Sequence, residues 1–595
     1  MSEKRTIMQV LDESAKLWPS LPALKHKANG AWVPLNYGDY RTKVRQIARG
    51  FMKLGLEPGQ GVSIIGYNSV EWFVADIAAI FAGGVPAGIY TTSSAEQCQY
   101  ITDHCDAAIV VVENKEHLAK LLEVRAALPK VKAYVVVSGE GANPADGIYA
   151  FESLYALGES VPEAELEARI AAQKADDTAT LIYTSGTTGQ PKAVMITHDN
   201  ITWTARQTID LIGVQPGDLG LSYLPLSHIA EQIVSIHGPM QAGATSCIAE
   251  SLEKLGDNLR EIRPHSFLGV PRVWEKIQAK MAAVGAQTTG LKKKIAVWAK
   301  KVGLQAGYAE QSGEPKPFMT PIAKKLVFDK VREKLGLDRC RMQITSAAPI
   351  SKDTLEFFLS LGLPLFEVYG MSECTGPATY SPPGNYRTAK AGICIPGAEL
   401  KIAEDGEVCM RGKHVFKGYL KNAEATAETI DAEGWLHSGD IGTIDENGFL
   451  QITDRKKDLL ITAGGENVAP QVIEGMLKGI PVIAQAVVIG DRMKFLTALV
   501  TLDGERVAKD AEAAGSAART TEDAAKCAVF NAWLLREVEK LNAKLARVQT
   551  IKKVTILPSE LSIEGGELTP TMKVKRKVVN EKYKSQIAAM YDGAS

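Results

Sequence analysis

The feature that most constrains this chain is the segment 184–192, Thr-Ser-Gly-Thr-Thr-Gly-Gln-Pro-Lys, which lies between two apolar runs rich in β-formers. The runs, 179–183 and 193–197, predict a strand, a glycine-rich loop and a second strand. Small residues let backbone N–H groups approach an anion, hydroxyl groups add donors, and Lys192 adds a positive charge. The loop therefore indicates a polyphosphate site, with an ordinary hairpin turn as the alternative. The spacing excludes a P-loop NTPase, because no Gly-Lys-Ser/Thr opens a helix here.

Length and composition set the broad class. A chain of 595 residues is too long for one compact domain, and 45% hydrophobic and 23% charged residues are typical of a soluble globular protein. The net charge of −1 gives no global field for nucleic acid. Eight scattered cysteines without a C-x-x-C pair indicate free thiols in a reducing compartment rather than a zinc site. No secretory signal is visible, so we expect a cytoplasmic protein with at most peripheral membrane contact.

The order of apolar segments predicts an α/β fold. Strand and helix patterns alternate before the loop, at 61–65, 70–81, 107–112, 115–127 and 133–137, and continue after it with a helix at 229–241. The most apolar stretch, 73–90, contains Asp76 and Pro86 and reads as a buried helix followed by a strand rather than a membrane span. Asp405-Gly406 and Asn447-Gly448 predict β-hairpins. Beyond residue 468 we expect a helix to 478, strands at 484–489 and 496–502, and a helical excursion over 505–546.

At the loop 184–192 the sequence resembles the adenylate-forming acyl/aryl-CoA synthetase superfamily, whose signature is a Ser/Thr/Gly loop ending in Pro-Lys. The continuation 198–203, His-Asp-Asn-Ile-Thr-Trp, is most similar to the long-chain, bubblegum-type fatty acyl-CoA synthetases. Ala193 departs from the family's usual glycine, with little expected effect. The resemblance covers about residues 15–576 through five motifs in order. It implies a large N-terminal domain (1–454) of helix-covered, largely parallel sheets with a small β-barrel-like subdomain, and a small mobile α+β C-terminal domain (455–595).

The resemblance implies a set of nucleotide contacts. Tyr369 stacks on adenine, Ser372 bonds the phosphate and Glu373 holds Mg²⁺, for which a hard oxygen ligand is suited. Asp440 accepts hydrogen bonds from the ribose hydroxyls and Arg455 contacts the ribose. The full set implied for ATP binding is Thr184, Ser185, Gly186, Thr187, Thr188, Gly189, Lys192, Ala347, Ala348, Tyr369, Gly370, Met371, Ser372, Asp440, Arg455 and Lys573.

Two further motifs imply movement of the small domain. Lys457 corresponds to the hinge between the domains, whereas Lys456 reads as a solvated surface charge. The loop of Gly464, Gly465, Glu466 and Asn467 is implied to turn toward the site for the CoA step. Near the C-terminus, Leu-Thr-Pro-Thr-Met-Lys at 568–573 is similar to the catalytic-lysine motif. We choose Lys573 over Lys575 and Lys577 as the cation that stabilises charge at the reacting α-phosphate.

The acyl side is implied by Leu-Pro-Leu-Ser-His at 224–228. His228 would lie at the mouth of the acyl pocket, with Ile229, Val234 and Met240 behind it; a satisfied core histidine is the alternative. The segment 267–274 is implied to wall the pocket and the nucleotide cleft.

Residues 276–334 are locally basic, with 13 basic and 4 acidic residues, a balance of +9. Apolar residues lie between the lysines with partly helical spacing. A solvated helical excursion is one interpretation, and an interfacial helix on anionic lipid is the other.

The resemblance therefore implies a long-chain fatty acid–CoA ligase that uses ATP, Mg²⁺ and coenzyme A, forms acyl-AMP and pyrophosphate, and transfers the acyl group to CoA. Lys573, Glu373, Lys192 and His228 are the expected catalytic residues. Medium-chain or aryl acids, and an acceptor other than CoA, remain alternatives. So does an inactive acyl-nucleotide binder, although the intact motif residues disfavour it. The oligomeric state, monomer or homodimer, is open.

Overall fold

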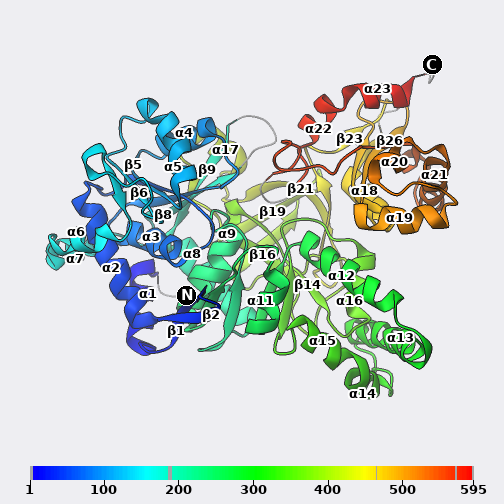
Figure 1. The fold of residues 1–595 in the computed structure, drawn as a ribbon, viewed down its shortest axis with the longest axis horizontal. Helices are drawn as coiled ribbons and strands as arrows, with labels where there is room; N and C mark the ends of the chain where they lie inside the picture. The colour runs from blue at the N-terminus through cyan, green and yellow to red at the C-terminus, as the bar shows by residue number, and fades with distance from the viewer. Residues whose placement is uncertain (1–3, 185–189, 464–465, 570–572, 593–595) are drawn as a thin grey trace.

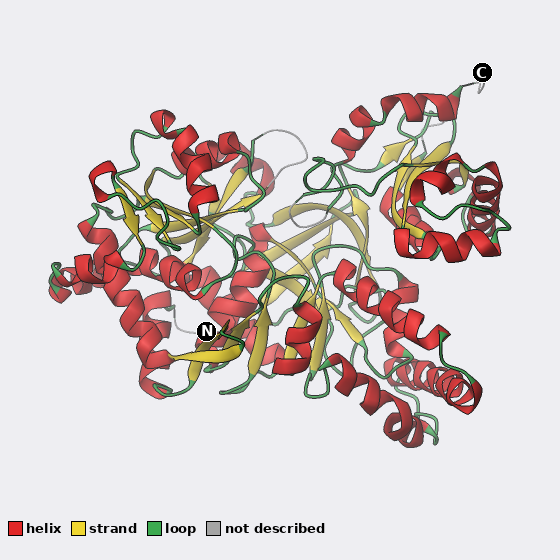
Figure 2. Ribbon diagram, viewed as in Figure 1, coloured by secondary structure: helices red, strands yellow, loops and turns green. Residues whose placement is uncertain are grey.

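The structure is a computed structural model that describes residues 4–184, 190–463, 466–569 and 573–592, without the side chain of Asn467. Figures 1 and 2 show a large body of sheets covered by helices and, at the upper right, a smaller unit formed by the C-terminal part of the chain. This arrangement confirms the expected α/β architecture.

The central sheet has eight strands, and the predicted polyphosphate loop leaves from it. Its order is β20 (Gly418–Tyr419), β9 (Lys192–Thr197), β8 (Thr178–Thr184), β4 (Val85–Ile89), β3 (Gly61–Ile65), β5 (Ala107–Val112), β6 (Ala133–Val136) and β7 (Ile148–Ala150). The strands from β8 to β7 are parallel. β9 pairs antiparallel with β8, so the predicted strand–loop–strand is a hairpin.

Helices cover both faces of this sheet. Val111 packs in a core with α2 (Tyr37–Lys53) and α3 (Val70–Phe81), whereas Val110 and Val112 pack in another with α4 (Ala95–His104) and α5 (Lys115–Glu123). Because successive side chains of a strand point to opposite faces, an unbroken apolar run such as 107–112 needs two cores. The remaining helices of this part are α1 (Ile7–Leu17), α6 (Ser153–Glu159) and α7 (Glu163–Ala172).

Two further groups of strands complete the α/β body. One sheet has the order β10 (Leu219–Ser222), β11 (Thr245–Ile248), β1 (Pro22–Ala28) and β2 (Ala31–Asn36). The other is parallel, with β12 (Ser266–Gly269), β13 (Met342–Thr345) and β14 (Leu365–Glu367). Helices α8 (His198–Ile212), α11 (Leu255–Ile262) and α16 (Lys352–Leu359) pack around them.

The helix predicted over 229–241 is present, but its middle part is π-helical. The segment is α9 (Ile229–Glu231), a π-helix over Gln232–His237 and α10 (Gly238–Ala242). Pro239 lacks an N–H group and its ring crowds the carbonyl four residues earlier, so the regular hydrogen-bond ladder widens before it.

The segment 369–455 forms the β-rich subdomain. A three-stranded sheet contains β15 (Tyr369–Met371), β16 (Gly376–Tyr380) and β17 (Ile393–Cys394). The antiparallel sheet β18 (Ala398–Ile402), β19 (Glu407–Gly412), β21 (Leu436–Ile444) and β22 (Leu450–Arg455) follows, with α17 (Ala423–Thr429) beside it. Gly406 and Gly448 lie in the two predicted turns at φ of +84° and +83°, and both predicted hairpins are confirmed.

The basic segment is helical. It contains α12 (Pro271–Ala286), α13 (Gly290–Ser312), α14 (Thr320–Ala323), a π-helix over Lys324–Phe328 and α15 (Asp329–Leu335). In the part of the chain that the structure describes, no helix combines the length and apolarity needed to cross a bilayer.

The C-terminal unit has its own core. β25 (Ile483–Ile489), β26 (Leu496–Leu502) and β27 (Ile551–Ile556) form a sheet against α18 (Pro470–Lys478), and the short hairpin β23 (Leu460–Ile461) and β24 (Asn467–Val468) precedes it. The expected single excursion over 505–546 is instead α19 (Gly504–Ala513), α20 (Thr521–Lys526) and α21 (Ala528–Asn542). Gly515 at φ of +68° ends the first helix, and the Thr520 capping box begins the second. The last helices are α22 (Arg576–Lys582) and α23 (Lys584–Tyr591).

Candidate active site

One cleft of about 2320 Å³ lies between the large body and the C-terminal unit. Its walls come from segments more than 380 residues apart in the chain, and most of the predicted site residues meet there. These are Thr184, Lys192, His228, Ala347, Ala348, Tyr369, Gly370, Met371, Ser372, Glu373, Asp440, Arg455, Lys457 and Lys573. Ser185, Gly186, Thr187, Thr188 and Gly189, like Gly464 and Gly465, lie outside the described residues.

The predicted ribose carboxylate is held from two sides. Arg455 Nε donates to Asp440 Oδ1 at 3.0 Å, and the Tyr369 hydroxyl donates to Asp440 Oδ2 at 2.7 Å. Register places Asp440 of β21 directly opposite Arg455 of β22. Each carboxylate oxygen can accept a second hydrogen bond, so Asp440 stays able to bind a pair of vicinal hydroxyls.

Glu373 lies in a short 3₁₀ turn after β15 and is buried. The Tyr419 hydroxyl donates to its Oε1 at 2.8 Å, and the Lys192 ammonium lies 4.7 Å from the centre of the Tyr419 ring. Tyr419 therefore joins the predicted metal ligand to the predicted loop lysine. Sequence reasoning missed Tyr419, because only the pairing of β20 with β9 brings it there and no local pattern marks it.

The backbone at Ala347 is strained. Its φ of +75° is in the left-handed region, which costs a residue with a Cβ about 1 kcal/mol or more. The neighbouring Ser346 hydroxyl donates to the Val368 carbonyl at 2.8 Å, which fixes this turn against the strand that leads to Tyr369. Strain of this kind concentrates at ligand sites, in agreement with the predicted adenine contact.

Lys573 reaches the cleft from the C-terminal unit. Its backbone N–H donates to Thr569 Oγ1 at 3.0 Å, and its carbonyl accepts from the Thr569 N–H at 2.8 Å. Desolvation and the charge of Arg455 lower the pKa of Lys573, while Asp440 and Glu373 act in the opposite direction. The ammonium thus shares its environment with the two carboxylates predicted to bind nucleotide and metal.

His228 caps the short helix α9, and its Nδ1 accepts a hydrogen bond from the Ala230 N–H at 3.2 Å. Burial, and then the charge of Lys573, lower the His228 pKa to about 4. The imidazole is therefore neutral at neutral pH. Because Nδ1 accepts, the proton is on Nε2, which is available as a donor.

The cleft continues into an apolar region beyond His228. Ile229 and Val234 line it as predicted, whereas Met240 is buried in the core behind and does not. Of the segment 267–274, Leu268, Val270, Pro271 and Arg272 line the cleft. Other apolar residues that line the cleft include Leu211, Ile212, Ile233, Met342 and Ile344, and we call these together with Ile229, Val234 and Leu268 the acyl wall. This lining suits a hydrocarbon chain.

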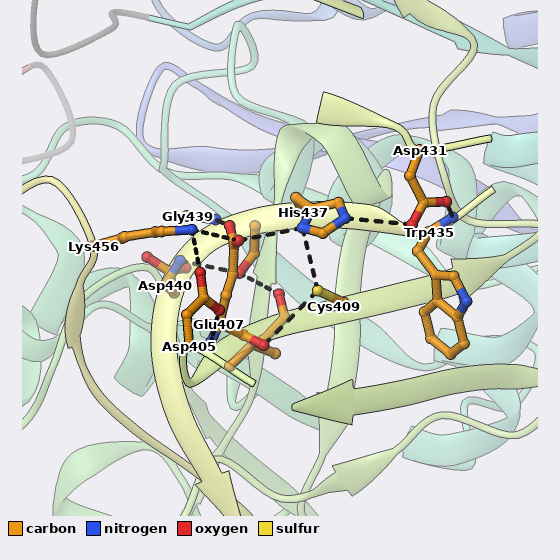
Figure 3. A network of polar contacts seen from close by, with 11 residues as sticks. Asp405, Glu407, Cys409, Asp431, Trp435, His437, Gly439, Asp440 and Lys456 are labelled. Atoms are coloured by element: carbon orange, nitrogen blue, oxygen red, sulfur yellow. Dashed lines mark hydrogen bonds and ion pairs between the residues drawn. The ribbon is translucent and has the colours of Figure 1, made fainter. Parts of the chain in front are cut away.

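Lys456, expected to be a solvated charge, is anchored to the large body. Its ammonium donates to Asp405 Oδ2 at 2.6 Å and to Glu407 Oε2 at 3.0 Å, and its N–H donates to the Gly439 carbonyl at 2.8 Å. Figure 3 shows that Glu407 also reaches His437, which continues the network to Asp431. The hinge candidate Lys457 therefore directly follows a fixed residue.

Glu407, Cys409 and His437 also bring one potential metal-ligand atom each within 4.8 Å of one another. The Lys456 ammonium already neutralises Glu407, and burial raises the pKa of the Cys409 thiol to about 11. These partners account for the cluster as an ion-pair network. All eight cysteines are free, as expected.

Of the loop predicted for the CoA step, Glu466 is described, and it does not line the cleft. Glu466 is exposed, and it closes a turn with Thr462 through two hydrogen bonds. Neither Glu466 nor the rest of the described segment 461–468 lines the cleft, whereas Lys573 does.

Comparison with known proteins agrees with this geometry. The AMP-binding enzyme family model matches residues 11–420, and the model of the AMP-binding enzyme C-terminal domain matches residues 457–595.

Curated relatives align over almost the whole chain. A Xenopus laevis protein named long-chain-fatty-acid–CoA ligase ACSBG2 is 45% identical over 99% of this chain and 84% of its own length. A human protein named long-chain-fatty-acid–CoA ligase ACSBG1 is 40% identical over 98% of this chain and 85% of its own.

Solved structures share the fold. The adenylation domain of a carboxylic acid reductase from Segniliparus rugosus, in complex with AMP, has a TM-score of 0.76 at 20% identity and covers 100% of this chain and 95% of its own. The anthranilate CoA ligase AuaEII has a TM-score of 0.74 at 17% identity, with 99% of both chains covered.

Proposed function

The chain belongs to the AMP-binding enzyme family, as its motifs predict, and we propose that it is an AMP-forming ligase that joins long-chain fatty acids to coenzyme A. One observation carries the proposal. Lys573 of the C-terminal unit lines the same cleft as Lys192, Glu373 and Asp440 of the large body, and the residues of the acyl wall line this cleft too. A carboxylate on a hydrocarbon chain and a nucleoside triphosphate fit these two halves.

In the first half-reaction a fatty-acid carboxylate oxygen attacks the α-phosphorus of ATP. The bond to the β-phosphate breaks, pyrophosphate leaves, and acyl-AMP remains. Lys573 stabilises the negative charge that gathers on the α-phosphate, and Lys192 the charge of the departing pyrophosphate. The neutral His228, which lines the same cleft, can donate a hydrogen bond from its Nε2 to the reacting groups.

The residues present fit a magnesium ion. Glu373 is a buried carboxylate that Tyr419 orients through one oxygen, and Tyr419 also contacts Lys192 at the end of the phosphate loop. Mg²⁺ binds through one or two carboxylates plus phosphate oxygens, and when bound it neutralises phosphate charge. Glu373 is the residue that would hold it.

In the second half-reaction the CoA sulfur attacks the acyl carbonyl carbon, the bond to the phosphate oxygen breaks, and AMP leaves. We propose that the C-terminal unit rotates about Lys457 between the half-reactions, so that the loop at 464–467 replaces Lys573 at the cleft. Two features support this: the C-terminal unit has its own core, and Glu466 lies outside the cleft while Lys573 lines it.

Acid-dependent exchange between ATP and labelled pyrophosphate tests the first half-reaction. Exchange should be measured with short-chain, medium-chain, long-chain and aryl acids. It should be fastest with long-chain acids, because burial of each added methylene against the acyl wall strengthens binding. Adding CoA should then give acyl-CoA and AMP. Formation of ADP, or absence of exchange with every acid, would overturn the proposal. Exchange without thioester formation would indicate another acceptor.

A further inference from the structure

Exposed apolar side chains concentrate in the basic segment. Of the thirteen large hydrophobic residues exposed in the described chain, six lie between residues 284 and 326. They are Val284, Leu291, Val297, Phe318, Ile322 and Leu326, with exposed fractions between 44% and 88%. Single exposed apolar residues are ordinary on a protein surface, but a concentration of this kind indicates a contact surface.

Lysines lie among these side chains. On α13 the residues Lys293, Lys294, Val297 and Lys301 follow the spacing of one helix face and are exposed, while Ala299 and Val302 on the other side are buried. On α14 and the π-helix that follows it, Ile322, Lys325 and Leu326 are exposed, while Ala323 and Phe328 are buried. The two buried sides meet in one small core, so α13 and the segment 320–328 form one packed helical unit whose exposed surface carries these lysines and apolar side chains.

Most of the exposed lysines of this helical unit have no acidic partner among the described residues. Lys292, Lys293, Lys294, Lys301 and Lys325 form no ion pair with any residue that the structure describes. Of the segment's four acidic residues, Glu310 pairs with Lys316 and Asp329 with Lys324, both within the segment. A second copy of this chain would place one positive surface against another, so the complementary partner is anionic.

We propose that this face is a docking surface for an anionic lipid bilayer. We define the docking face as Val284, Leu291, Val297, Phe318, Ile322 and Leu326 with Lys292, Lys293, Lys294, Lys301 and Lys325. The lysines pair with lipid headgroups, and the apolar side chains enter the boundary between headgroups and acyl chains. In Figure 1, α13 and α14 form the lower right edge of the molecule, and no other element covers them there in this view.

The docking face connects with the cleft through two helices. Pro271, Arg272 and Glu275 of the first turns of α12 line the cleft, and the last turn of the same helix carries Val284. Leu304 of α13 packs against the same buried cluster as Ile212 and Leu268, and these two residues line the cleft. This inference rests on the proposed function: through this connection the enzyme takes its fatty acid at the lipid surface, where such acids partition.

Co-sedimentation of the full-length protein with vesicles tests the docking face, without ATP or CoA. Vesicles that contain phosphatidylserine should bind the protein, and phosphatidylcholine vesicles should bind it far less. The triple variant Lys292→Gln, Lys293→Gln, Lys294→Gln should lose about a hundredfold in affinity, because each lysine near an anionic surface contributes about fivefold. The variant Phe318→Ser with Ile322→Ser should lose more than about tenfold.

The matched control is Val529→Ser with Lys552→Gln and Lys553→Gln, three exposed positions of the C-terminal unit, which should bind like the unchanged protein. All variants should keep their pyrophosphate exchange with a short, water-soluble acid, which shows that they fold. Equal binding by all variants, no binding to anionic vesicles, or a dimer that the docking-face variants dissociate would overturn the proposal. Vesicle binding by a protein that forms no acyl-AMP would overturn the proposed function alone.

Discussion

At the scale of single residues, the proposed chemistry depends on a lysine of the C-terminal unit that lines a cleft shared with the large body. Lys573 lies close enough to Asp440, Glu373 and Arg455 for their charges to change its pKa, and it also lowers the pKa of His228. These couplings place the ammonium in the cleft and make its role testable without a ligand-bound structure.

Lys573→Met should abolish the charge while keeping the length of the side chain. We expect pyrophosphate exchange to fall by about a hundredfold or more, the usual loss for a preorganised electrostatic donor. Thioester formation from added acyl-AMP and CoA should change little, because Lys573 leaves the cleft for that step. Lys577→Met is the matched control, since Lys577 also borders the cleft. Equal losses in both half-reactions would contradict the assignment.

Asp76 gives a prediction for stability. It is 1% exposed, and neither carboxylate oxygen has a hydrogen-bond partner among the described residues. Burial raises its pKa from 3.8 to about 7. The Asp76 carboxyl therefore loses its proton near pH 4 in the unfolded chain but only near pH 7 in the native protein. Between these pH values the native protein holds more protons than the unfolded chain, so its free energy of unfolding falls as the pH rises from 4 to 7.

Asp76→Asn should remove this loss. Relative to the unchanged protein, the variant should gain thermal stability progressively from pH 4 to pH 7, by a few kcal/mol in free energy of unfolding, after which the difference should level off. Melting temperatures across this range provide the measurement. Glu404→Gln, at an exposed position, should show no such trend. A constant difference between variant and unchanged protein at all pH values would refute the explanation.

At the scale of elements, the end of β22 belongs to the predicted nucleotide site and leads directly into the predicted hinge. Arg455 binds Asp440, Lys456 is anchored through its side chain and backbone, and Lys457 follows. Because Lys456 is anchored, rotation of the C-terminal unit is confined to the backbone bonds that follow it. Loss of this anchor should therefore affect the change from one half-reaction to the other more than the rate of either half-reaction.

Lys456→Gln should therefore lower the rate of acyl-CoA formation relative to the rate of pyrophosphate exchange, by about fivefold at most, because the ion pairs are partly exposed. Lys456→Arg should restore the ratio by keeping the charge. The two rates are measured with the same acid. If both rates fell equally, Lys456 would act on the site itself and not on the hinge.

At the scale of the whole molecule, two ion pairs between residues of the cleft and its border join the large body to the C-terminal unit. Arg272 Nη2 lies 3.1 Å from Glu560 Oε2, and Lys478 Nζ lies 4.0 Å from Glu275 Oε1. Partly exposed pairs contribute about 0–1 kcal/mol each. A weak set of contacts is in keeping with the proposed rotation of the C-terminal unit between the half-reactions.

A double-mutant cycle of Arg272→Gln and Glu560→Gln should accordingly give a coupling of less than about 1 kcal/mol for the exchange rate at low salt. The coupling should shrink at high salt, because exposed charges are screened. A coupling of several kcal/mol would mean that the two units form a permanent interface.

The sequence by itself determined the local structure and the identity of most site residues. Strands 61–65, 107–112 and 496–502 and the helix 70–81 have the predicted bounds, because unbroken apolar runs and capping residues are local signals. The motifs also named fourteen residues that line the cleft. The domain limits and the individual roles of these residues stay predictions.

Only the tertiary structure decided which distant residues meet. Tyr419 bonds Glu373 from 46 residues away, Lys456 pairs with Asp405 from 51 residues away, and Asp76 is left without a partner in the core. The π-helical turn in the acyl wall and the apolar face among the lysines also required three-dimensional packing. The reason is physical: hydrophobic period and turn chemistry act within a few residues, whereas strand pairing, burial and charge coupling depend on how the whole chain closes on itself.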